Sequence, residues 1–329
     1  MLVLAKAMLS LMAGFILAII CGLILIPVLK RKTKQSISIF LQNKHKEKEG
    51  TPTMGGLIFI IPTTLIVLGL LITNKIQYSG NLLLIMVVFL GYGFLGFIDD
   101  YLIIKRKNNL GLTEIQKLFG QLIIAVLFFL IYMKSGNDTV IDIHTLNIAV
   151  DLKWFYGIFI LFMLVASTNA VNITDGLDGL AGGLSLIAFL AMGLITWNST
   201  WITGNTDIAI FCFILVGSLL GFLFFNTHPA KIFMGDMGSL ALGGTLASIA
   251  ILTDYELTFI IIMGVFIIET LASLVQIFSV MVFGKKVFLM TPLHHHFEKL
   301  GIAEADVVKA FWVVGLILAM AGVLFAVWI

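Results

Sequence analysis

The sequence predicts an all-α, polytopic integral membrane protein. Of its 329 residues, 60% are hydrophobic, and the mean hydropathy is +1.10. Several apolar runs reach about 18 residues or more, which is long enough for a helix to cross a bilayer. The alternation of apolar and polar residues typical of a membrane β-barrel is absent. A soluble fold is excluded because it needs more polar residues to cover its surface.

The apolar runs predict about ten transmembrane helices in a single domain spanning residues 1–329. The first run is too long for a signal-peptide core and has no small-residue cleavage site, so we expect a retained helix. The ninth is long and the eighth short, which favours a broken or tilted helix there. The ten predicted spans are 8–29, 54–73, 81–104, 115–133, 152–173, 180–197, 206–226, 239–253, 256–284 and 308–328.

The basic residues predict the orientation of these helices. Of the 20 Lys and Arg residues, 16 fall in loops on one side and four on the other, namely Lys6, Lys75, Lys134 and Lys153. The positive-inside rule places the larger set in the cytoplasm and both termini outside. The net charge of +2 gives no indication of nucleic-acid binding.

The predicted orientation then divides the acidic residues between the two sides of the membrane. At the outer ends, solvated loops would explain Asp138, Asp142, Asp151, Asp207, Asp254 and Glu256. At the cytoplasmic ends of four segments lie Asp99, Asp100, Asp175, Asp178 and Asp236. Carboxylates at one depth and on one side are expected to converge.

Two adjacent acids end the third span in "GFIDD". Neighbours on a helix point about 100° apart, so Asp99 and Asp100 are expected to have different partners. One would face a cation or a proton, and the other a partner such as Lys. The alternative is an interfacial pair that simply reaches water.

The stretch "NAVNITDGLDGLAGG" places a polar residue at every third position. Asn169, Asn172, Asp175 and Asp178 would form a polar stripe if the segment is helical. The glycines that follow permit close backbone approach or a break in the helix. The alternative is an Asx/Gly turn between two spans.

In "NTHPAKIFMGDMG", Asp236 lies between glycines where the next helix begins. This position suits a hard cation such as Mg²⁺, which takes oxygen ligands and bridges to phosphates. The alternative is an ordinary helix N-cap. Asn226 lies nearby, and Phe233 is either an interfacial anchor or a stacking platform for a base.

The loop "MTPLHHHFEKLG" carries His294, His295 and His296. Zinc usually takes spaced ligands, so phosphate binding or proton transfer suits three consecutive imidazoles better. The alternative is a solvated loop.

Two further cytoplasmic segments carry cations. Lys48 precedes "GTPTMGG", in which Pro52 is expected in the first turn of the second span and Thr51 or Thr53 at its cap. Lys117 is either a positive-inside anchor or a phosphate-binding cation.

The remaining polar and small residues lie within apolar spans. Glu269 and Gln276 interrupt the ninth span, while Gly217 and Gly221 form a small-xxx-small pair typical of helix packing.

Acids, amides and lysines at a membrane surface indicate chemistry on a phosphate. The motifs "KEGTPTMGG", "GFIDD", "NAVNITDGLDGLAGG", "NTHPAKIFMGDMGSLALGG" and "MTPLHHHFE", in this order, resemble the phospho-N-acetylmuramoyl-pentapeptide transferase family. They run from Lys48 to Glu298. The triple histidine and the TPTMGG turn favour this family over the related polyprenyl-phosphate N-acetylhexosamine-1-phosphate transferases.

The resemblance implies transfer of phospho-MurNAc-pentapeptide from UDP-MurNAc-pentapeptide to undecaprenyl phosphate, with release of UMP. It also implies Mg²⁺ as cofactor and a homodimer in the bacterial plasma membrane with its active site on the cytoplasmic face. The implied catalytic residues are Asp99, Asp100, Asp236, His294, His295 and His296, with Asp236 as the Mg²⁺ ligand. The implied substrate-binding residues are Lys48, Thr53, Lys117, Asn169, Asn172, Asp175, Asp178, Asn226, Phe233 and Gln276.

Two mechanisms and two other functions stay open at this point. Asp99 deprotonates the lipid phosphate for direct attack, or an aspartate attacks first and forms a covalent phospho-enzyme. The alternative functions are a sibling transferase that uses UDP-GlcNAc and an ion-coupled transporter. Transporters usually hold their acids near the bilayer midplane, whereas these acids are predicted at one interface.

Overall fold

The computed structural model describes residues 2–32, 48, 50–106, 111–143, 148–197 and 205–328. Twelve helices and one β-hairpin lie within these ranges. In chain order they are α1 (Leu2–Lys32), α2 (Leu57–Ile72), α3 (Gly80–Arg106), α4 (Glu114–Lys134), β1 (Val140–Ile143), β2 (Ile148–Asp151), α5 (Phe155–Thr174), α6 (Leu180–Trp197), α7 (Thr206–Asn226), α8 (Gly235–Leu252), α9 (Glu256–Ile262), α10 (Gly264–Phe283), α11 (Leu293–Lys299) and α12 (Glu304–Trp328). The predicted all-α fold is confirmed.

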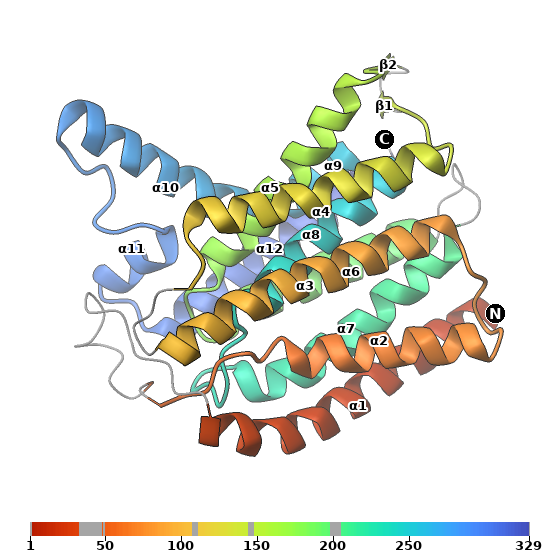
Figure 1. Ribbon diagram of the computed structural model, residues 1–329. Helices are drawn as coiled ribbons and strands as arrows, with labels where there is room; N and C mark the ends of the chain where they lie inside the picture. The colour runs from red at the N-terminus through yellow and green to blue at the C-terminus, as the bar shows by residue number, and fades with distance from the viewer. Residues whose placement is uncertain are drawn as a thin grey trace.

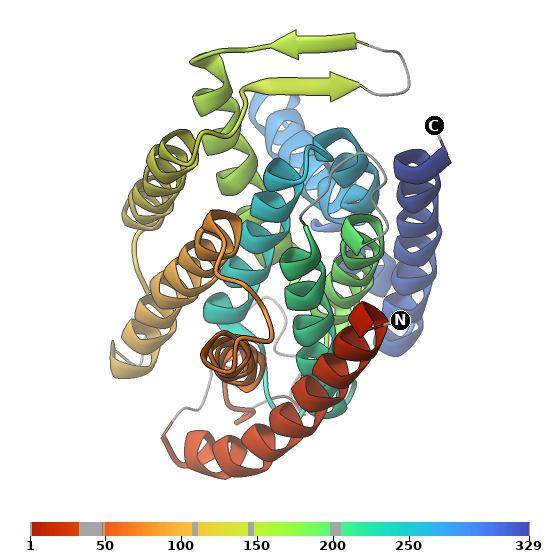
Figure 2. The same cartoon turned by 90° about the vertical axis from the view of Figure 1, so that its right-hand side faces the viewer.

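Two helices, α7 and α8, form the centre of the bundle, and most of their side chains are buried. Helix α7 packs against α1, α2 and α6, while α8 packs against α3 and α5. The predicted pair Gly217 and Gly221 lies on the face of α7 that contacts α1, so its packing role is confirmed. Figures 1 and 2 show α1, α4, α10 and α12 around this centre.

The outer helices have the surface expected of a chain that spans a bilayer. Within the described residues, nine helices are long and apolar enough to cross a membrane, and α2 is a shorter apolar helix of 16 residues. Large apolar side chains lie exposed along α1 and α10, including Leu23 at 62% and Met281 at 79%. Lipid tails, unlike water, are a favourable environment for such faces.

The second predicted span begins later than expected, and the ninth is divided in two. The second span begins at Leu57, because Met54 has a positive φ of 69° and residues 54–56 form a turn. Pro52 therefore lies before the helix, and Gly56 is the N-cap without a side-chain hydrogen bond. The predicted ninth span is broken at Met263 into α9 and α10, which confirms the expected interruption.

The sequence did not predict the β-hairpin. Strands β1 and β2 pair antiparallel, with Val140 opposite Asp151. The hairpin lies at the same end of the bundle as both termini, whereas α11 lies at the other end (Figures 1 and 2). Both termini are therefore on one side of the bundle, and the cellular identity of that side stays a prediction. Among the basic residues used to predict it, Lys34, Lys44, Lys46 and Lys107 fall outside the described residues.

One outer acid is not solvated as expected. Glu256 is only 1% exposed, and it accepts a hydrogen bond of 2.6 Å from the hydroxyl of Tyr156. The sequence reasoning was wrong here because it could not see that α5 supplies a buried donor to the start of α9.

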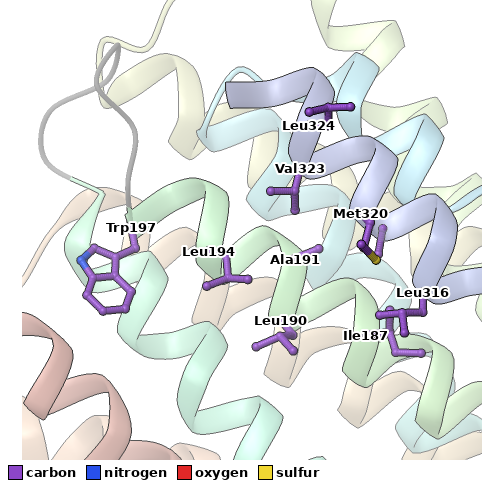
Figure 3. Close-up of a pocket in the computed structure, with 10 residues that line it drawn as sticks. Ile187, Leu190, Ala191, Leu194, Trp197, Leu316, Met320, Val323 and Leu324 are labelled. Carbon is purple, nitrogen blue, oxygen red and sulfur yellow. The ribbon is translucent and has the colours of Figure 1, made fainter. Parts of the chain in front are cut away.

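An apolar pocket of about 650 Å³ lies between α6 and α12 (Figure 3). Its lining includes Leu190, Trp197, Leu316 and Met320. Such a lining suits hydrocarbon and offers no group for catalysis, so the candidate site is elsewhere.

Candidate active site

Five polar side chains from four helices form what we call the aspartate cluster: Asp99, Asp100, Lys117, Asn172 and Asp236. Asp236, in the first turn of α8, accepts a hydrogen bond from the ammonium group of Lys117 on α4. Its second oxygen accepts a hydrogen bond of 2.9 Å from the Asn172 amide on α5. Asp99, Asp100 and Asp236, three of the five carboxylates predicted to converge, therefore lie in one cluster with side chains of α4 and α5.

Asp99 lies beside the same lysine. Its Oδ2 is 3.7 Å from Lys117 Nζ, and its Oδ1 accepts a hydrogen bond of 2.7 Å from the backbone N–H of Leu112. Lys117 thus lies between two carboxylates, Asp99 and Asp236. A lysine that served only as a positive-inside anchor would not need these two contacts.

Asp100 has a different environment, as the helical geometry predicted. Its carboxylate accepts hydrogen bonds of 3.2 Å from the backbone N–H groups of Asp236 and Met237, so α3 caps the first turn of α8. Asp236 itself is not the N-cap, which is Met234. Gly235 has a φ of 75°, and a Cβ there would collide with Asp100 and crowd the buried hydroxyl of Thr53. Asp100 and Thr53 therefore lie against the backbone that carries Asp236.

Only the first half of the predicted polar stripe is helical. Helix α5 ends at Thr174, so Asp175 and Asp178 lie in a turn before α6 and not on the helix face of Asn169 and Asn172. The glycines allow this break. Asn169 donates 3.1 Å to the side chain of Gln121 on α4, so its amide is engaged between helices and not in the aspartate cluster.

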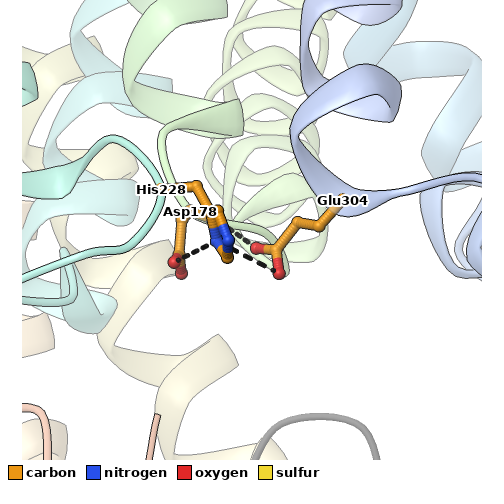
Figure 4. A group of neighbouring side chains, drawn as sticks. All are labelled: Asp178, His228 and Glu304. Carbon is orange, nitrogen blue, oxygen red and sulfur yellow. Dashed lines mark hydrogen bonds and ion pairs between the residues drawn. The ribbon is translucent and has the colours of Figure 1, made fainter. Parts of the chain in front are cut away.

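A second group, the lysine cluster, consists of Lys48, Asp178, His228 and Glu304. The Lys48 ammonium group is 2.7 Å from Asp178 and 2.6 Å from Glu304. His228 Nδ1 is 3.2 Å from Asp178 and 3.6 Å from Glu304, so its ring lies between both carboxylates (Figure 4). The cluster joins the segment before α2 to the start of α12.

Asp175 connects the two clusters electrostatically. Burial, and after it the charges of Asp236 and Asp178, raise the pKa of this carboxyl to about 7, while Lys48 opposes the shift. A carboxyl with this pKa exchanges its proton near neutral pH. The turn thus presents a titratable group between the clusters.

Asn226 and Phe233 hold and cover this region from the α7–α8 connection. Asn226, buried at the end of α7, accepts a hydrogen bond of 3.1 Å from the N–H of Gly179 and donates 2.9 Å to Ile232. Phe233 is half-buried, and its backbone pairs with Pro52 and Gly55. Both predicted residues therefore lie next to the turn or the TPTMGG segment.

The three histidines belong to a short helix, α11, so the alternative of a solvated loop is wrong. His294 is fully buried, and its Nδ1 is 3.3 Å from Oε1 of Glu269 on α10. A Cβ on Gly176 would collide with His294 Nε2, so α11 abuts the turn that carries Asp175 and Asp178. Burial lowers the pKa of His294, and the contact with Glu269 partly offsets this shift.

The other two histidines have different partners. His295 Nδ1 is 2.6 Å from Glu298 Oε2, one turn along α11. His296 Nδ1 accepts a hydrogen bond of 3.1 Å from the N–H of Leu289, which requires the proton of the neutral ring to be on Nε2. Gln276 does not reach this group and instead bonds the backbone of Val287 and Phe288, which anchors the segment after α10.

The oxygen-rich aspartate cluster fits a magnesium ion. Asp99 and Asp236 are like charges that approach one another around a single ammonium group, and a hard cation with phosphate oxygens suits such donors. The atoms of Asp178, His228 and Glu304 also lie within 4.8 Å of one another. There, however, Lys48 already neutralises both carboxylates, so a metal would have to displace it.

The sequence reasoning missed three groups of this region. Glu304 lies at the end of the last span that is predicted to face the cytoplasm, as the aspartates do. This position could have identified it as a candidate site residue. The hydroxyl of Ser239 accepts a hydrogen bond of 2.9 Å from the Asn172 amide, and Glu298 pairs with His295. Glu298 lies three residues after His295, so the i, i+3 spacing was a usable signal for a helical segment. No spacing rule identifies Ser239, because helix packing alone brings it to Asn172.

Comparisons with known proteins agree with this arrangement. The model of glycosyl transferase family 4 matches residues 82–254, and signature 1 of phospho-N-acetylmuramoyl-pentapeptide-transferase matches residues 48–60. Proteins named phospho-N-acetylmuramoyl-pentapeptide-transferase from Geobacillus thermodenitrificans, Bacillus subtilis and Shouchella clausii are each 48% identical to this chain. The alignments cover 96%, 97% and 97% of this chain, and 96%, 98% and 97% of the respective relatives.

Both matches fall on the residues that build the site. The signature begins at Lys48, and the family model includes Asp99, Lys117, Asp175 and Asp236. The resemblance stated from five motifs is thus confirmed over nearly the whole chain. The chain belongs to the phospho-N-acetylmuramoyl-pentapeptide-transferase family, within glycosyl transferase family 4.

Proposed function

We propose that this protein transfers phospho-MurNAc-pentapeptide from UDP-MurNAc-pentapeptide to undecaprenyl phosphate and releases UMP. The observation that carries this proposal is the convergence of the aspartate cluster, the lysine cluster and α11 on one turn, residues 175–179. Carboxylates, ammonium groups and imidazoles so arranged suit the binding of a diphosphate and the departure of a phosphate. The relatives' names support the same reaction.

Asp236 and Asp99 are the groups best placed to hold Mg²⁺. When bound, Mg²⁺ neutralises the charge of the diphosphate. Lys117, which already contacts both carboxylates, would then contribute positive charge to the substrate phosphates. Asn172 orients Asp236 through its amide.

We assign proton removal from the lipid phosphate to Asp99 and a positioning role to Asp100. Both oxygens of Asp100 already accept N–H groups of α8, which leaves this carboxylate poorly suited to act as a base or nucleophile. Asp99 has an oxygen next to Lys117 and is better suited to direct transfer. A trapped phospho-sugar enzyme or ping-pong kinetics would contradict this assignment.

The lysine cluster and its surroundings are proposed to bind the nucleotide donor. Lys48, Asp178, Asn226 and Phe233 surround the same turn from different segments. The remaining predicted binding residues, Thr53, Asn169 and Gln276, hold neighbouring backbone or helices, and we propose that they act through that support. The homodimer, the plasma membrane and a cytoplasmic active site belong to this proposal as well.

The decisive experiment is an assay of the purified protein with UDP-MurNAc-pentapeptide, undecaprenyl phosphate and Mg²⁺. UMP release that requires all three components is the expected result. Turnover with UDP-GlcNAc in place of the muramoyl donor would favour the sibling transferase. Absence of UMP release together with ion flux in proteoliposomes would favour a transporter.

A further inference from the structure

Glu269 is a fully buried carboxylate in α10, among the apolar side chains of a membrane helix. An unpaired carboxylate in such a place is strongly unfavourable, so a buried glutamate needs a partner. Its Oε1 accepts a hydrogen bond of 3.1 Å from the backbone N–H of His294 and lies 3.3 Å from Nδ1 of the same residue. One oxygen thus bonds the first turn of α11 and lies beside the imidazole ring.

The opposite side of the ring faces the 175–179 turn. His294 Nε2 is so close to Gly176 that this position has no room for a Cβ. Within the described residues, Nε2 is buried and has no hydrogen-bond partner, and Nδ1 approaches Oε1 of Glu269 without meeting hydrogen-bond geometry. A buried polar atom without a partner is unfavourable, so the unpaired Nε2, which faces the turn that carries Asp175 and Asp178, indicates a group that arrives with the substrate.

We infer that Glu269 is a positioning residue that holds the proton of neutral His294 on Nδ1 and keeps Nε2 as an acceptor for a donor group of the nucleotide substrate. The inference rests on the proposed function, because it requires the 175–179 turn to border the substrate site. A carboxylate that orients an imidazole and fixes its tautomer is an effective way to set which nitrogen reacts.

The charged groups around His294 come from each element that touches it. Glu269 lies on α10, His295 and Glu298 lie on α11, and Asp175 adjoins Gly176 in the turn. Among these acids Glu269 has the direct contacts, a hydrogen bond with the backbone N–H and an approach of 3.3 Å to the ring. Removal of its charge should therefore lower the pKa of His294 more than a change at Glu298.

The test is Glu269→Gln, measured as UMP release with both substrates at a series of pH values around neutrality. The side chain keeps its shape and can still accept the His294 N–H, so α11 remains in place. We expect kcat/KM for the nucleotide to fall by about 100-fold, chiefly through a higher KM, because the acceptor contacts the nucleotide. The acidic limb of the kcat/KM profile should move to lower pH, because neutral His294 persists to lower pH once the negative charge is gone.

The matched control is Glu256→Gln, which alters another buried glutamate, at the opposite end of the bundle. It should lower the melting temperature without moving the acidic limb. If Glu269→Gln also lowers only the melting temperature and leaves kcat/KM and the limb unchanged, the role of Glu269 is structural and the inference is overturned.

Two more variants complete the test. If Glu269→Gln does not fold, Glu269→Asp retracts the charge by one methylene and should lower kcat/KM with a partial shift of the limb; a wild-type profile would overturn the inference. His294→Ala and the wild-type protein separate the two levels of proposal. Absence of UMP release from the wild type would overturn the proposed function, whereas wild-type turnover of His294→Ala would remove His294 from the site and overturn the inference alone. Loss of turnover in His294→Ala with a wild-type profile in Glu269→Gln would overturn the inference about Glu269 alone.

Discussion

Asp236 depends on donors from two other helices for its position. Lys117 and Asn172 each bind one of its oxygens, and Asp100 binds the backbone N–H groups at its base. A carboxylate fixed from three directions loses little conformational entropy when it binds a cation, which is the requirement for a preorganised metal ligand.

At this scale we predict that Asp236→Asn abolishes Mg²⁺-dependent turnover while the protein remains folded. The neutral amide binds a hard cation poorly, and it leaves Lys117 with Asp99 as its remaining carboxylate in this cluster. UMP release measures the loss, and gel filtration with a melting curve checks the fold. The control Asp138→Asn, in an exposed acid before the hairpin, should retain activity. Substantial Mg²⁺-dependent activity of Asp236→Asn would contradict the metal assignment.

Asp175 shows a conflict between stability and function in one residue. Its pKa is raised by burial and by Asp236 and Asp178 to about 7, from an ordinary value of 3.8. The folded state therefore holds a proton that the unfolded state has released between about pH 4 and 7. Protonation of Asp175 therefore stabilises the folded state. This stabilisation is lost as the pH rises, and above about pH 7 the ionised carboxylate lowers the free energy of unfolding by its full amount.

We therefore predict that Asp175→Asn raises the melting temperature at pH 8 more than at pH 5, while it lowers turnover. The amide removes the buried charge that exists at the higher pH, and at the lower pH wild-type Asp175 is already protonated. Differential scanning fluorimetry at both pH values measures the effect, with exposed Asp306→Asn on α12 as control. An equal change at both pH values would mean that the charge of Asp175 does not affect stability.

At the scale of elements, glycines decide how closely the helices of the bundle approach. Gly217 on α7 meets the backbone of α1, and a Cβ there would collide with the carbonyl oxygen of Leu11. Gly14 of α1 contacts Ile214 of α7 in the same way. In a bilayer, where burial of apolar surface gives little driving force, such close packing supplies much of the attraction between helices.

We predict that Gly217→Ala lowers the stability by about 1–3 kcal/mol, because α1 must move away from α7. A melting curve in detergent measures the change. Gly69→Ala in α2 is the matched control, since a Cβ at that position meets nothing within 4 Å and alanine favours a helix. Equal melting temperatures for Gly217→Ala and the wild type would show that α1 can shift without cost.

At the scale of the whole molecule, the two ends of the bundle carry different structural elements. The hairpin and both termini lie at one end, and α11 lies at the other (Figures 1 and 2). The polar clusters lie at the end of α11, because His294 contacts the turn between α5 and α6. If the basic loops are cytoplasmic, the reaction takes place at the inner surface of the membrane.

Single cysteines can test this orientation in a background with Cys21→Ala and Cys212→Ala. We predict that Val150→Cys, exposed on β2, reacts with a membrane-impermeant maleimide in intact spheroplasts. Lys286→Cys, exposed after α10, should react only after permeabilisation. The reverse pattern would place the hairpin inside and overturn the predicted topology.

The sequence by itself determined the membrane class, most helices and the level at which the acids lie. Length and hydropathy are sufficient for this, because a bilayer requires long apolar helices and polar residues collect at their ends. The ordered motifs also indicated the family, and several residues predicted for the site, among them Lys48, Asn226 and His294, contact the 175–179 turn.

The tertiary structure decided which side chain serves which partner. Asp100 caps α8, Lys117 lies between Asp99 and Asp236, and Glu269 holds His294, yet each pair joins residues far apart in the chain. The local sequence pattern also led to the wrong prediction that Glu256 is solvated, because its partner Tyr156 comes from another helix. Spacing along one helix specifies a face, but a hydrogen bond depends on the distance between two helices, and packing alone sets that distance.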